Sequence, residues 1–189
     1  LETLRALRDR HGLVSMLWMG GEPLLKPKLL EQGIALFAHN TVTTNGTVPL
    51  VDFGPDVLYV VSLDGPEDLN DRIRGDGTFR RVMKTLSGIP AGFGSPVQVQ
   101  CVVTQRNQDR LEELVQAVRT TRAGWMTFSF YVPRAGDFGE DAWPDNEARA
   151  AAAEALDNEG GAPSEARTEQ RDDRGRDGGR DRPRDRDRD

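Results

Sequence analysis

The chain has 189 residues, of which 37% are hydrophobic and 30% are charged, and its formal net charge at pH 7 is −6. This negative charge argues against a protein that binds nucleic acid through bulk electrostatic attraction. No apolar run approaches the roughly 20 residues that a membrane-spanning helix needs. Cys101 is the single cysteine, which excludes an internal disulfide and any zinc site built on several thiolates.

The first half of the chain predicts helices that alternate with short strands. Leu1, Leu4 and Leu7 recur at helical spacing, and a basic turn followed by Gly12 ends this helix. Because the helix is already in progress at Leu1, we expect that an N-terminal element is missing from the chain. The next predicted elements are a strand at 13–18, a helix whose apolar face spans 29–37, a strand at 41–44 and a proline-containing loop at 47–56.

The second half begins with the most apolar run of the chain, a predicted strand at 57–63. The charge-rich stretch from Pro66 to Gly77 predicts a loop, and Asn107 is a suitable N-cap for a later helix. The remaining predicted elements are an amphipathic helix at 79–89, a strand at 97–103, a helix at 111–118 and a strand at 125–132.

Strands that alternate with helices predict an α/β fold with a parallel sheet and right-handed crossovers. A doubly wound sheet and part of a (β/α) barrel both satisfy this order, and both bind ligands at the carboxyl ends of the strands. Residues 138–156 predict a linker with a short helix. Residues 157–189 hold 9 basic and 11 acidic residues and almost no apolar ones, and they predict a disordered tail.

Two segments that follow strands carry residues suited to bind a small ligand. Gly20 and Gly21 allow close approach of the backbone to a ligand, and Glu22 can accept hydrogen bonds from an ammonium group. The alternative for this segment is an ordinary strand-to-helix turn.

The second segment places Ser62 and Asp64 at the end of a buried strand, and Arg74 follows within a charged stretch. An arginine near a strand end can bind a carboxylate through two parallel hydrogen bonds. The alternatives are a capped turn for the Asp64–Pro66 stretch and a solvated surface charge for Arg74.

Taken together, these segments resemble the radical S-adenosylmethionine (radical SAM) superfamily. The last of the matching motifs is similar to the subgroup with a C-terminal extra-cluster (SPASM) domain, which includes sulfatase-maturating and peptide-modifying enzymes. The resemblance covers about residues 1–137. The motifs are, in order, Trp18 to Leu25, Thr44 to Thr47, Ser62 to Pro66, and Asp71 to Gly75 with Gly77 to Phe79 and Val82-Met83.

The resemblance implies a partial parallel (β/α)6 barrel that lacks its first strand, with an incomplete core domain at 1–137. It implies S-adenosylmethionine (SAM) and a 4Fe-4S cluster as cofactors, and cleavage of SAM to a 5′-deoxyadenosyl radical that abstracts hydrogen from a peptide or small-molecule substrate. The glycine-glutamate turn would receive the SAM amino group, and Ser62 and Arg74 would contact its ribose and carboxylate. The implied SAM-binding residues are Gly20, Gly21, Glu22, Asn45, Ser62, Asp64 and Arg74, with the backbone at 133–135 bordering the adenine.

The chain departs from the family in its cysteines. The family holds its cluster with three cysteines spaced CxxxCxxC after the first strand, and this motif is absent here. Cys101 lies in a later predicted strand and is typical of a small buried hydrophobic residue. One thiolate cannot hold a cubane cluster. We therefore expect no metal ligand and no catalytic residue in this chain, which would be inactive as given.

Two alternatives remain open at this point. One is a non-catalytic, barrel-like binding protein that lacks the cluster. The other is a doubly wound nucleotide-binding domain, which is weakened by the lack of a GxGxxG or Walker motif. For the enzyme, the resemblance implies an electron donor such as a flavodoxin or ferredoxin and no nucleic-acid or membrane partner. Cluster chemistry argues for a reducing, cytoplasmic location.

Overall fold

The structure, a computed structural model, describes residues 1–132 and 146–159 of the chain. The predicted tail beyond residue 159 and the backbone at 133–135 lie outside the described residues. Among the residues described, no helix is long and apolar enough to cross a membrane.

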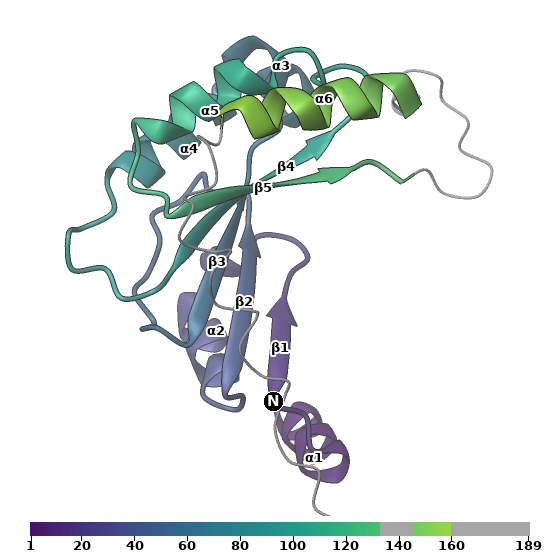
Figure 1. Cartoon of the computed structure of the whole chain (residues 1–189). Coiled ribbons are helices and arrows are strands. Elements are labelled where there is room, and N and C mark those ends of the chain that lie inside the picture. Colours follow the sequence, from purple (N-terminus) through teal and green to yellow (C-terminus); the bar gives the residue numbers. More distant parts are fainter. Residues whose placement is uncertain (133–145, 160–189) are drawn as a thin grey trace, which may run out of the picture. The chain divides into compact units, whose positions relative to one another are not determined.

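The centre of the fold is a sheet of five parallel strands in which each strand pairs with the next one in sequence (Figure 1). A doubly wound sheet reverses its strand order at a switch point, and the order β1-β2-β3-β4-β5 contains no reversal. The doubly wound alternative is therefore wrong. The first and last strands do not pair with each other, so the sheet is an open, partial barrel. The strands are β1 (Ser15–Trp18), β2 (His39–Thr44), β3 (Val57–Ser62), β4 (Val97–Val103) and β5 (Trp125–Phe130).

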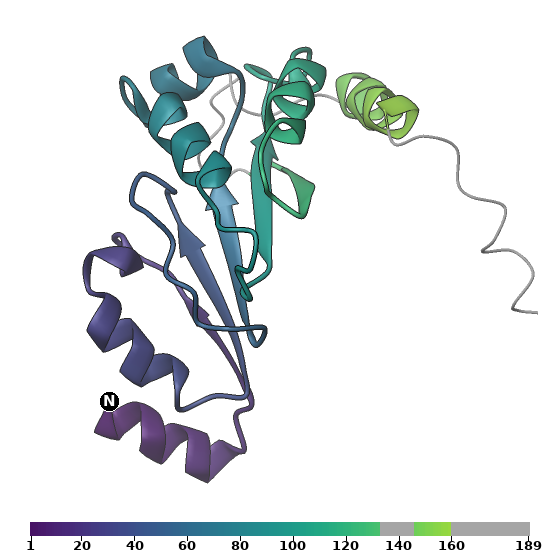
Figure 2. The same ribbon diagram turned by 90° about the vertical axis from the view of Figure 1, so that its left-hand side faces the viewer.

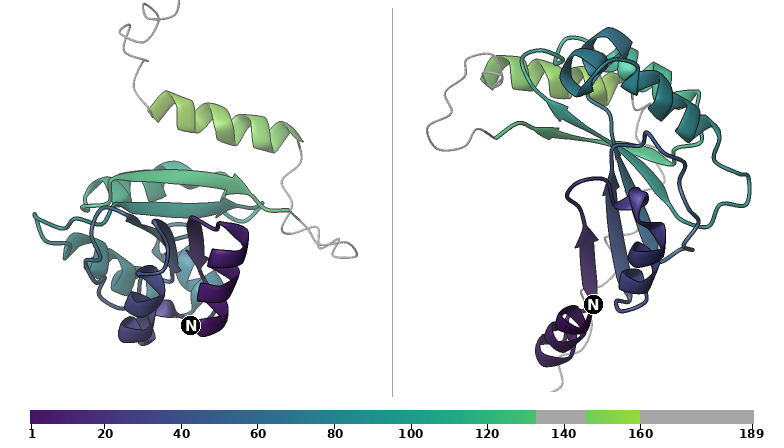
Figure 3. Two further views of the ribbon diagram at one scale, coloured as in Figure 1. Left: turned by 90° about the horizontal axis from the view of Figure 1, so that it is seen from below. Right: turned by 180° about the vertical axis from the view of Figure 1, so that it is seen from behind.

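The helices that connect the strands cover one face of the sheet. Right-handed crossovers between sequential strands all return on the same side, and Figure 2 shows α2 and α4 on one side of the strands. Helix α6 lies beside β5 (Figure 3), and Arg149 stacks over the Phe130 ring with its guanidinium carbon 4.7 Å from the ring centroid. The helices are α1 (Glu2–His11), the 3₁₀ turn η1 (Pro23–Leu25), α2 (Pro27–Ile34), α3 (Glu67–Arg74), α4 (Thr78–Ser87), α5 (Leu111–Arg119) and α6 (Asn146–Glu159).

Alternation along the strands distinguishes the two faces. In β4 the odd-numbered residues from Val97 to Val103 are buried beneath the helices, whereas Gln98 and Gln100 are partly exposed on the opposite face. The hydrophobic core therefore lies between the sheet and the helices. Its fully buried side chains include Val42, Val57, Tyr59, Val61, Leu63, Val82, Leu86, Val99, Val103 and Leu114.

Three sequence-based expectations about the elements need correction. The stretch from Pro66 to Gly77 contains helix α3, whose first turn is acidic and whose last turn is basic, as the helix dipole favours. Asn107 does not cap α5, which begins at Leu111 with Arg110 at its N-cap. Helix α6 continues to Glu159, three residues beyond the predicted end of the short helix.

The connection between β2 and β3, residues 45–56, contains no helix, as the sequence predicts. Asp52 fixes this connection to the loop before β4. Its carboxylate accepts hydrogen bonds from the backbone N–H groups of Gly54, Gly94 and Ser95 at 2.8–3.1 Å. These hydrogen bonds hold the pKa of Asp52 below its ordinary value.

The region around β1 is rich in exposed apolar side chains. In the described residues β1 pairs only with β2, and the exposed apolar side chains lie in β1, in the segments that flank it and in α1, η1 and α2. Leu17 is 50% exposed within the strand itself. The exposed side chains are Leu1, Leu7, Leu13, Val14, Leu17, Met19, Leu25 and Leu29. The sequence predicts that a strand is missing at the free edge of β1, and this stays a prediction.

Candidate functional site

The glycine-glutamate turn follows β1 at the carboxyl end of the sheet. Gly20 and Gly21 have φ angles of +95° and +56°, a backbone conformation that glycine adopts without strain. A Cβ atom at either position would meet no heavy atom within 4 Å. The turn thus presents bare backbone to open space, as a site for close approach of a ligand requires.

Glu22 joins this turn to the end of β2. Its Oε1 accepts hydrogen bonds from Leu24 N at 3.1 Å and Thr44 Oγ1 at 2.8 Å, and its Oε2 accepts one from Asn45 N at 2.8 Å. The structure therefore brings together two residues that the sequence placed in the site. These contacts also give the Glu22 carboxylate a structural role that the motif did not indicate.

Asn45 itself closes a local turn. Its Oδ1 accepts hydrogen bonds from Thr47 N at 2.9 Å and from Thr47 Oγ1 at 2.7 Å. The side-chain NH2 group of the exposed Asn45 makes no hydrogen bond to a described residue, so it can donate to a ligand at this edge of the sheet.

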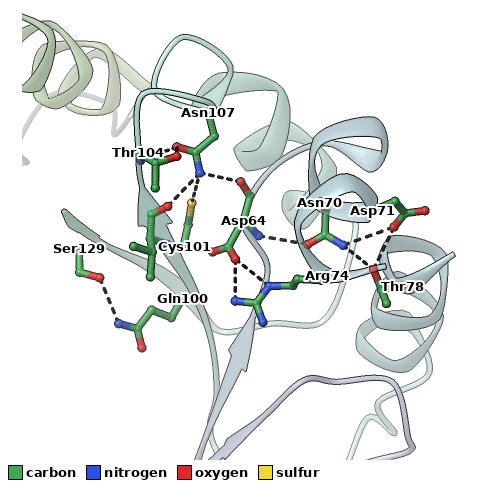
Figure 4. Close-up of polar contacts among 11 residues, drawn as sticks. Asp64, Asn70, Asp71, Arg74, Thr78, Gln100, Cys101, Thr104, Asn107 and Ser129 are labelled. Atoms are coloured by element: carbon green, nitrogen blue, oxygen red, sulfur yellow. Dashed lines mark hydrogen bonds and ion pairs between the residues drawn. The ribbon is translucent and has the colours of Figure 1, made fainter. Parts of the chain in front are cut away.

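The second segment lies at the end of β3 (Figure 4). Arg74 donates from Nε at 2.7 Å and from Nη2 at 2.6 Å to the same oxygen, Asp64 Oδ2. The Asp64 side chain is 8% exposed and that of Arg74 is 28% exposed. Because a guanidinium carries five N–H donors, three of them remain without a protein partner in the described chain. The outer edge of Arg74 can therefore still bind a carboxylate.

Ser62 ends β3 beside Gln100 of β4. Its side chain is half-buried, and its hydroxyl makes no hydrogen bond with any described residue. A hydroxyl can both donate and accept, so Ser62 offers an unused polar group two residues before Asp64.

Asn70 and Asn107 are parts of this site that the sequence reasoning missed. Both are fully buried, and both bind the peptide groups of Asp64. Asn70 lies in a charged stretch that predicts a loop, and Asn107 lies shortly after a strand, where it predicts a helix cap. The local sequence therefore gave no signal for these long-range contacts.

The two segments do not share one cavity. A cavity of about 580 Å³ lies beside Gly20, Gly21 and Glu22 and is otherwise lined mainly by apolar side chains, among them Trp18 and Leu29. Its lining includes none of Ser62, Asp64 or Arg74. The geometry of the polar groups at the strand ends, and not this cavity, therefore defines the candidate site.

The described residues fit SAM but do not fit an iron–sulfur cluster. Within 1–132 and 146–159, no three His, Cys, Asp or Glu side chains are grouped to hold a metal ion. Cys101 is fully buried, and burial together with the nearby Asp64 charge raises the pKa of its thiol to about 12. The bare glycine turn, the Ser62 hydroxyl and the free edge of Arg74 suit the amino-acid and ribose groups of SAM.

The chain is similar to known proteins both in sequence and in fold. The chain is 32% identical over 140 residues to the mycofactocin maturase MftC of Mycobacterium tuberculosis, in strain CDC 1551 and in strain H37Rv. This match covers 67% of the chain and 34% of the relative, so the chain spans about a third of the length of the curated relatives it matches. No protein-family model matches the chain.

Two solved structures share the fold. One is native anSMEcpe with bound AdoMet and the Kp18Cys peptide, with a TM-score of 0.65 and 18% identity over 83% of this chain and 50% of that chain. The other is Streptococcus suis SuiB bound to the precursor peptide SuiA, with a TM-score of 0.59 and 18% identity over 84% of this chain and 38% of that chain.

MftC, anSMEcpe and SuiB are radical SAM proteins. The sequence match to MftC and the partial barrel shared with the two structures agree with the four motifs at the carboxyl ends of the strands. The chain belongs to the radical SAM superfamily, as an SPASM-type core domain.

Proposed function

We propose that the chain is the SAM-binding part of a radical SAM enzyme that modifies a peptide. One observation carries this proposal: at the carboxyl end of β3, Arg74 is held by Asp64 and keeps three N–H donors without a partner among the described residues, and the Ser62 hydroxyl, two residues before Asp64, has no partner among them either. The names of the related proteins support a peptide substrate, since the two solved structures are described with bound peptides and one of them with AdoMet.

In this proposal each residue of the site has a separate role. The outer edge of Arg74 binds the SAM carboxylate, because a guanidinium and a carboxylate form charge-assisted hydrogen bonds. Ser62 donates to or accepts from the ribose and carboxylate region. Gly20 and Gly21 allow the SAM amino group to approach the backbone, and Glu22, already bound to the β2 loop, supplies negative charge beside that ammonium group.

SAM held by these residues would supply the radical chemistry: with one electron from a reduced cluster it would yield methionine and the 5′-deoxyadenosyl radical, which would abstract a hydrogen atom from the substrate. The cluster that would provide the electron needs cysteines other than Cys101. We propose that these lie in a segment preceding Leu1, and that a small electron donor such as a flavodoxin or ferredoxin reduces the cluster. We also propose that the enzyme acts in the cytoplasm, without nucleic-acid or membrane partners.

SAM binding to the 189-residue chain tests the proposal. The ¹⁵N–¹H correlation spectrum of the chain should shift in a saturable manner on titration with SAM. Arg74→Lys keeps the charge but removes the planar fork, and a hydrogen bond to a charged group contributes about 1.5–3 kcal/mol. We therefore expect the affinity to fall by about tenfold to a hundredfold.

Arg80→Lys is the matched control, because Arg80 also pairs with a carboxylate, that of Glu67, but its side chain is 79% exposed. It should leave the affinity unchanged. Equal affinity in the wild type and Arg74→Lys, or no saturable binding by the wild type, would contradict the proposed function.

The second candidate is a non-catalytic SAM-binding protein of the same fold. The burial of Cys101, the single cysteine, favours this candidate, because a buried thiol is not available as a cluster ligand and a protein that only binds SAM needs no cluster. The coding sequence upstream of Leu1 separates the two functions. A CxxxCxxC motif within some tens of residues would establish the enzyme, and a start codon at that point would establish the binding protein.

A further inference from the structure

Every polar atom of Asp64 takes part in a hydrogen bond with another residue of the chain (Figure 4). Its backbone N–H donates to Asn70 Oδ1 at 3.2 Å, and its backbone oxygen accepts from Asn107 Nδ2 at 2.7 Å. Its carboxylate oxygens accept from Val102 N at 3.1 Å and from Arg74. Each Asp64 atom that can form a hydrogen bond already has a protein partner, and its side chain is only 8% exposed, so we infer that Asp64 acts through its neighbours.

Asn107 makes the shorter of the two side-chain hydrogen bonds to the backbone of Asp64. Its Nδ2 also donates to Val102 O at 2.9 Å, and its Oδ1 accepts from Thr104 N at 2.7 Å. Asn107 thus connects Asp64, two residues after β3, to the end of β4 and to the turn that follows β4. Being fully buried, its amide cannot exchange these partners for water.

Asn70 holds the opposite side of the same peptide. Its Nδ2 donates to Thr78 Oγ1 at 3.0 Å, and Thr78 begins α4. Asp71 accepts hydrogen bonds from Gly77 N at 2.6 Å and Phe79 N at 2.8 Å, which fixes the loop between α3 and α4. Arg74, the last residue of α3, is therefore positioned from both of its ends: by its helix and by Asp64.

We propose that Asn107 is a positioning residue for SAM: it fixes the peptide of Asp64, and the Asp64 carboxylate then holds Arg74 with its free edge toward the SAM carboxylate. This inference rests on the proposed function, and it names a residue 33 positions beyond Arg74 that belongs to none of the motifs that indicated the site. Loss of Asn107 frees Asp64 O and Val102 O, so the Asp64 peptide and its side chain can rotate away from Arg74.

Asn40 offers a matched control. It is also a buried asparagine with several side-chain hydrogen bonds: it accepts one from Trp18 Nε1 and donates to Ile34 O and Phe37 O. It lies at the amino end of the sheet, in the first half of β2. Asn40→Ala and Asn107→Ala should therefore both lower stability, and only Asn107→Ala should alter Arg74.

The first measurement needs no cofactor. Hydrogen exchange at Arg74 Nε, which is slowed by its bond to Asp64, should become at least several-fold faster in Asn107→Ala and remain at the wild-type rate in Asn40→Ala. If Asn107→Ala does not fold, Asn107→Ser provides the same test with a smaller loss of contacts. An unchanged exchange rate in a folded Asn107 variant would overturn the inference.

The second measurement is the affinity for SAM in a double-mutant cycle. Asn107→Ala should weaken SAM binding about tenfold, which corresponds to about 1.4 kcal/mol, and Asn40→Ala should not. In the Arg74→Lys background, Asn107→Ala should cause no further loss. Full additivity with Arg74→Lys, or an equal loss in Asn40→Ala, would overturn the inference while leaving the proposed function intact. A wild-type chain that does not bind SAM would overturn both.

Discussion

Gly33→Ala should destabilise the folded chain, although alanine has a higher helix propensity than glycine. Gly33 lies in α2, where alanine is favoured by about 1 kcal/mol. A Cβ at this position would lie 2.4 Å from Cη2 of Trp18, a separation that requires the ring to move. Trp18 is held by a 2.9 Å hydrogen bond from its Nε1 to Asn40 Oδ1 and by an edge-on contact with Phe37.

The magnitude follows from these contacts. Overpacking typically costs about 1–3 kcal/mol, and loss of the Trp18 hydrogen bond adds about 1 kcal/mol. After the gain in helix propensity, the free energy of unfolding should fall by about 1–3 kcal/mol. For a domain of this size each kcal/mol changes Tm by about 2–4 °C. Thermal unfolding followed by circular dichroism at 222 nm should therefore show a Tm lower by about 2–12 °C.

Gly92→Ala is the control for this experiment, because a Cβ there would meet no atom within 4 Å. It should leave Tm unchanged or raise it slightly, since alanine reduces the freedom of the unfolded chain. If Gly33→Ala were as stable as Gly92→Ala, the close packing of Trp18 on α2 would be refuted.

Four further predictions concern the turn after β1, acid stability, the buried thiol and the sheet edge. Glu22→Gln should lower the free energy of unfolding in urea by about 1.5–3 kcal/mol, because an amide NH2 would face Asn45 N–H; an unchanged urea midpoint would count against the observed contacts. The pKa of Asp52 is lowered in the folded state, so its stabilisation is present above the ordinary carboxyl pKa of about 4 and is lost as the pH falls below it. Urea midpoints between pH 7 and pH 3 should accordingly fall less for Asp52→Asn than for the wild type, and parallel pH profiles would disprove this. Cys101, with a pKa raised to about 12, should react with a disulfide reagent only as fast as the chain unfolds, and rapid labelling of the native protein would contradict its burial. Leu17→Lys should reduce self-association in sedimentation velocity, because a charge blocks pairing at the free edge of β1. A wild-type chain that is monomeric at all concentrations would show that this edge does not pair with a second chain.

The strands could be predicted because their sequences carry their own signal. The run at 57–63 and the alternation at 97–103 are buried patterns, and both strands formed as expected. Helix α3 could not be predicted in this way, since only Leu69 and Asn70 of its residues are buried. Its stability depends on charges at its ends and on partners outside it, which a pattern of apolar residues does not reveal.

The candidate site shows the same division. The motifs named Glu22, Asn45, Ser62, Asp64 and Arg74, and the structure brings Glu22 to Asn45 and Asp64 to Arg74. The sequence did not show that Asp64 binds Val102, 38 positions away, or Asn107, 43 positions away. Such contacts are set by the register of β3 and β4, so they become visible only when the two strands lie side by side.

The sequential order of the strands has a consequence for the way the chain folds. Since every strand pairs with its neighbour in sequence, each new strand can be added to a ladder that already exists, and no strand has to wait for a distant segment before it is paired. Closures between sequential strands are shorter than closures between distant strands, and shorter closures favour faster folding. Pairing can thus proceed from β1 to β5 in the order in which a ribosome releases them. The contacts that cross between neighbouring units, such as the bond from Asn107 to Asp64, would then form only when β4 and the turn after it join the strands before them, ahead of β5.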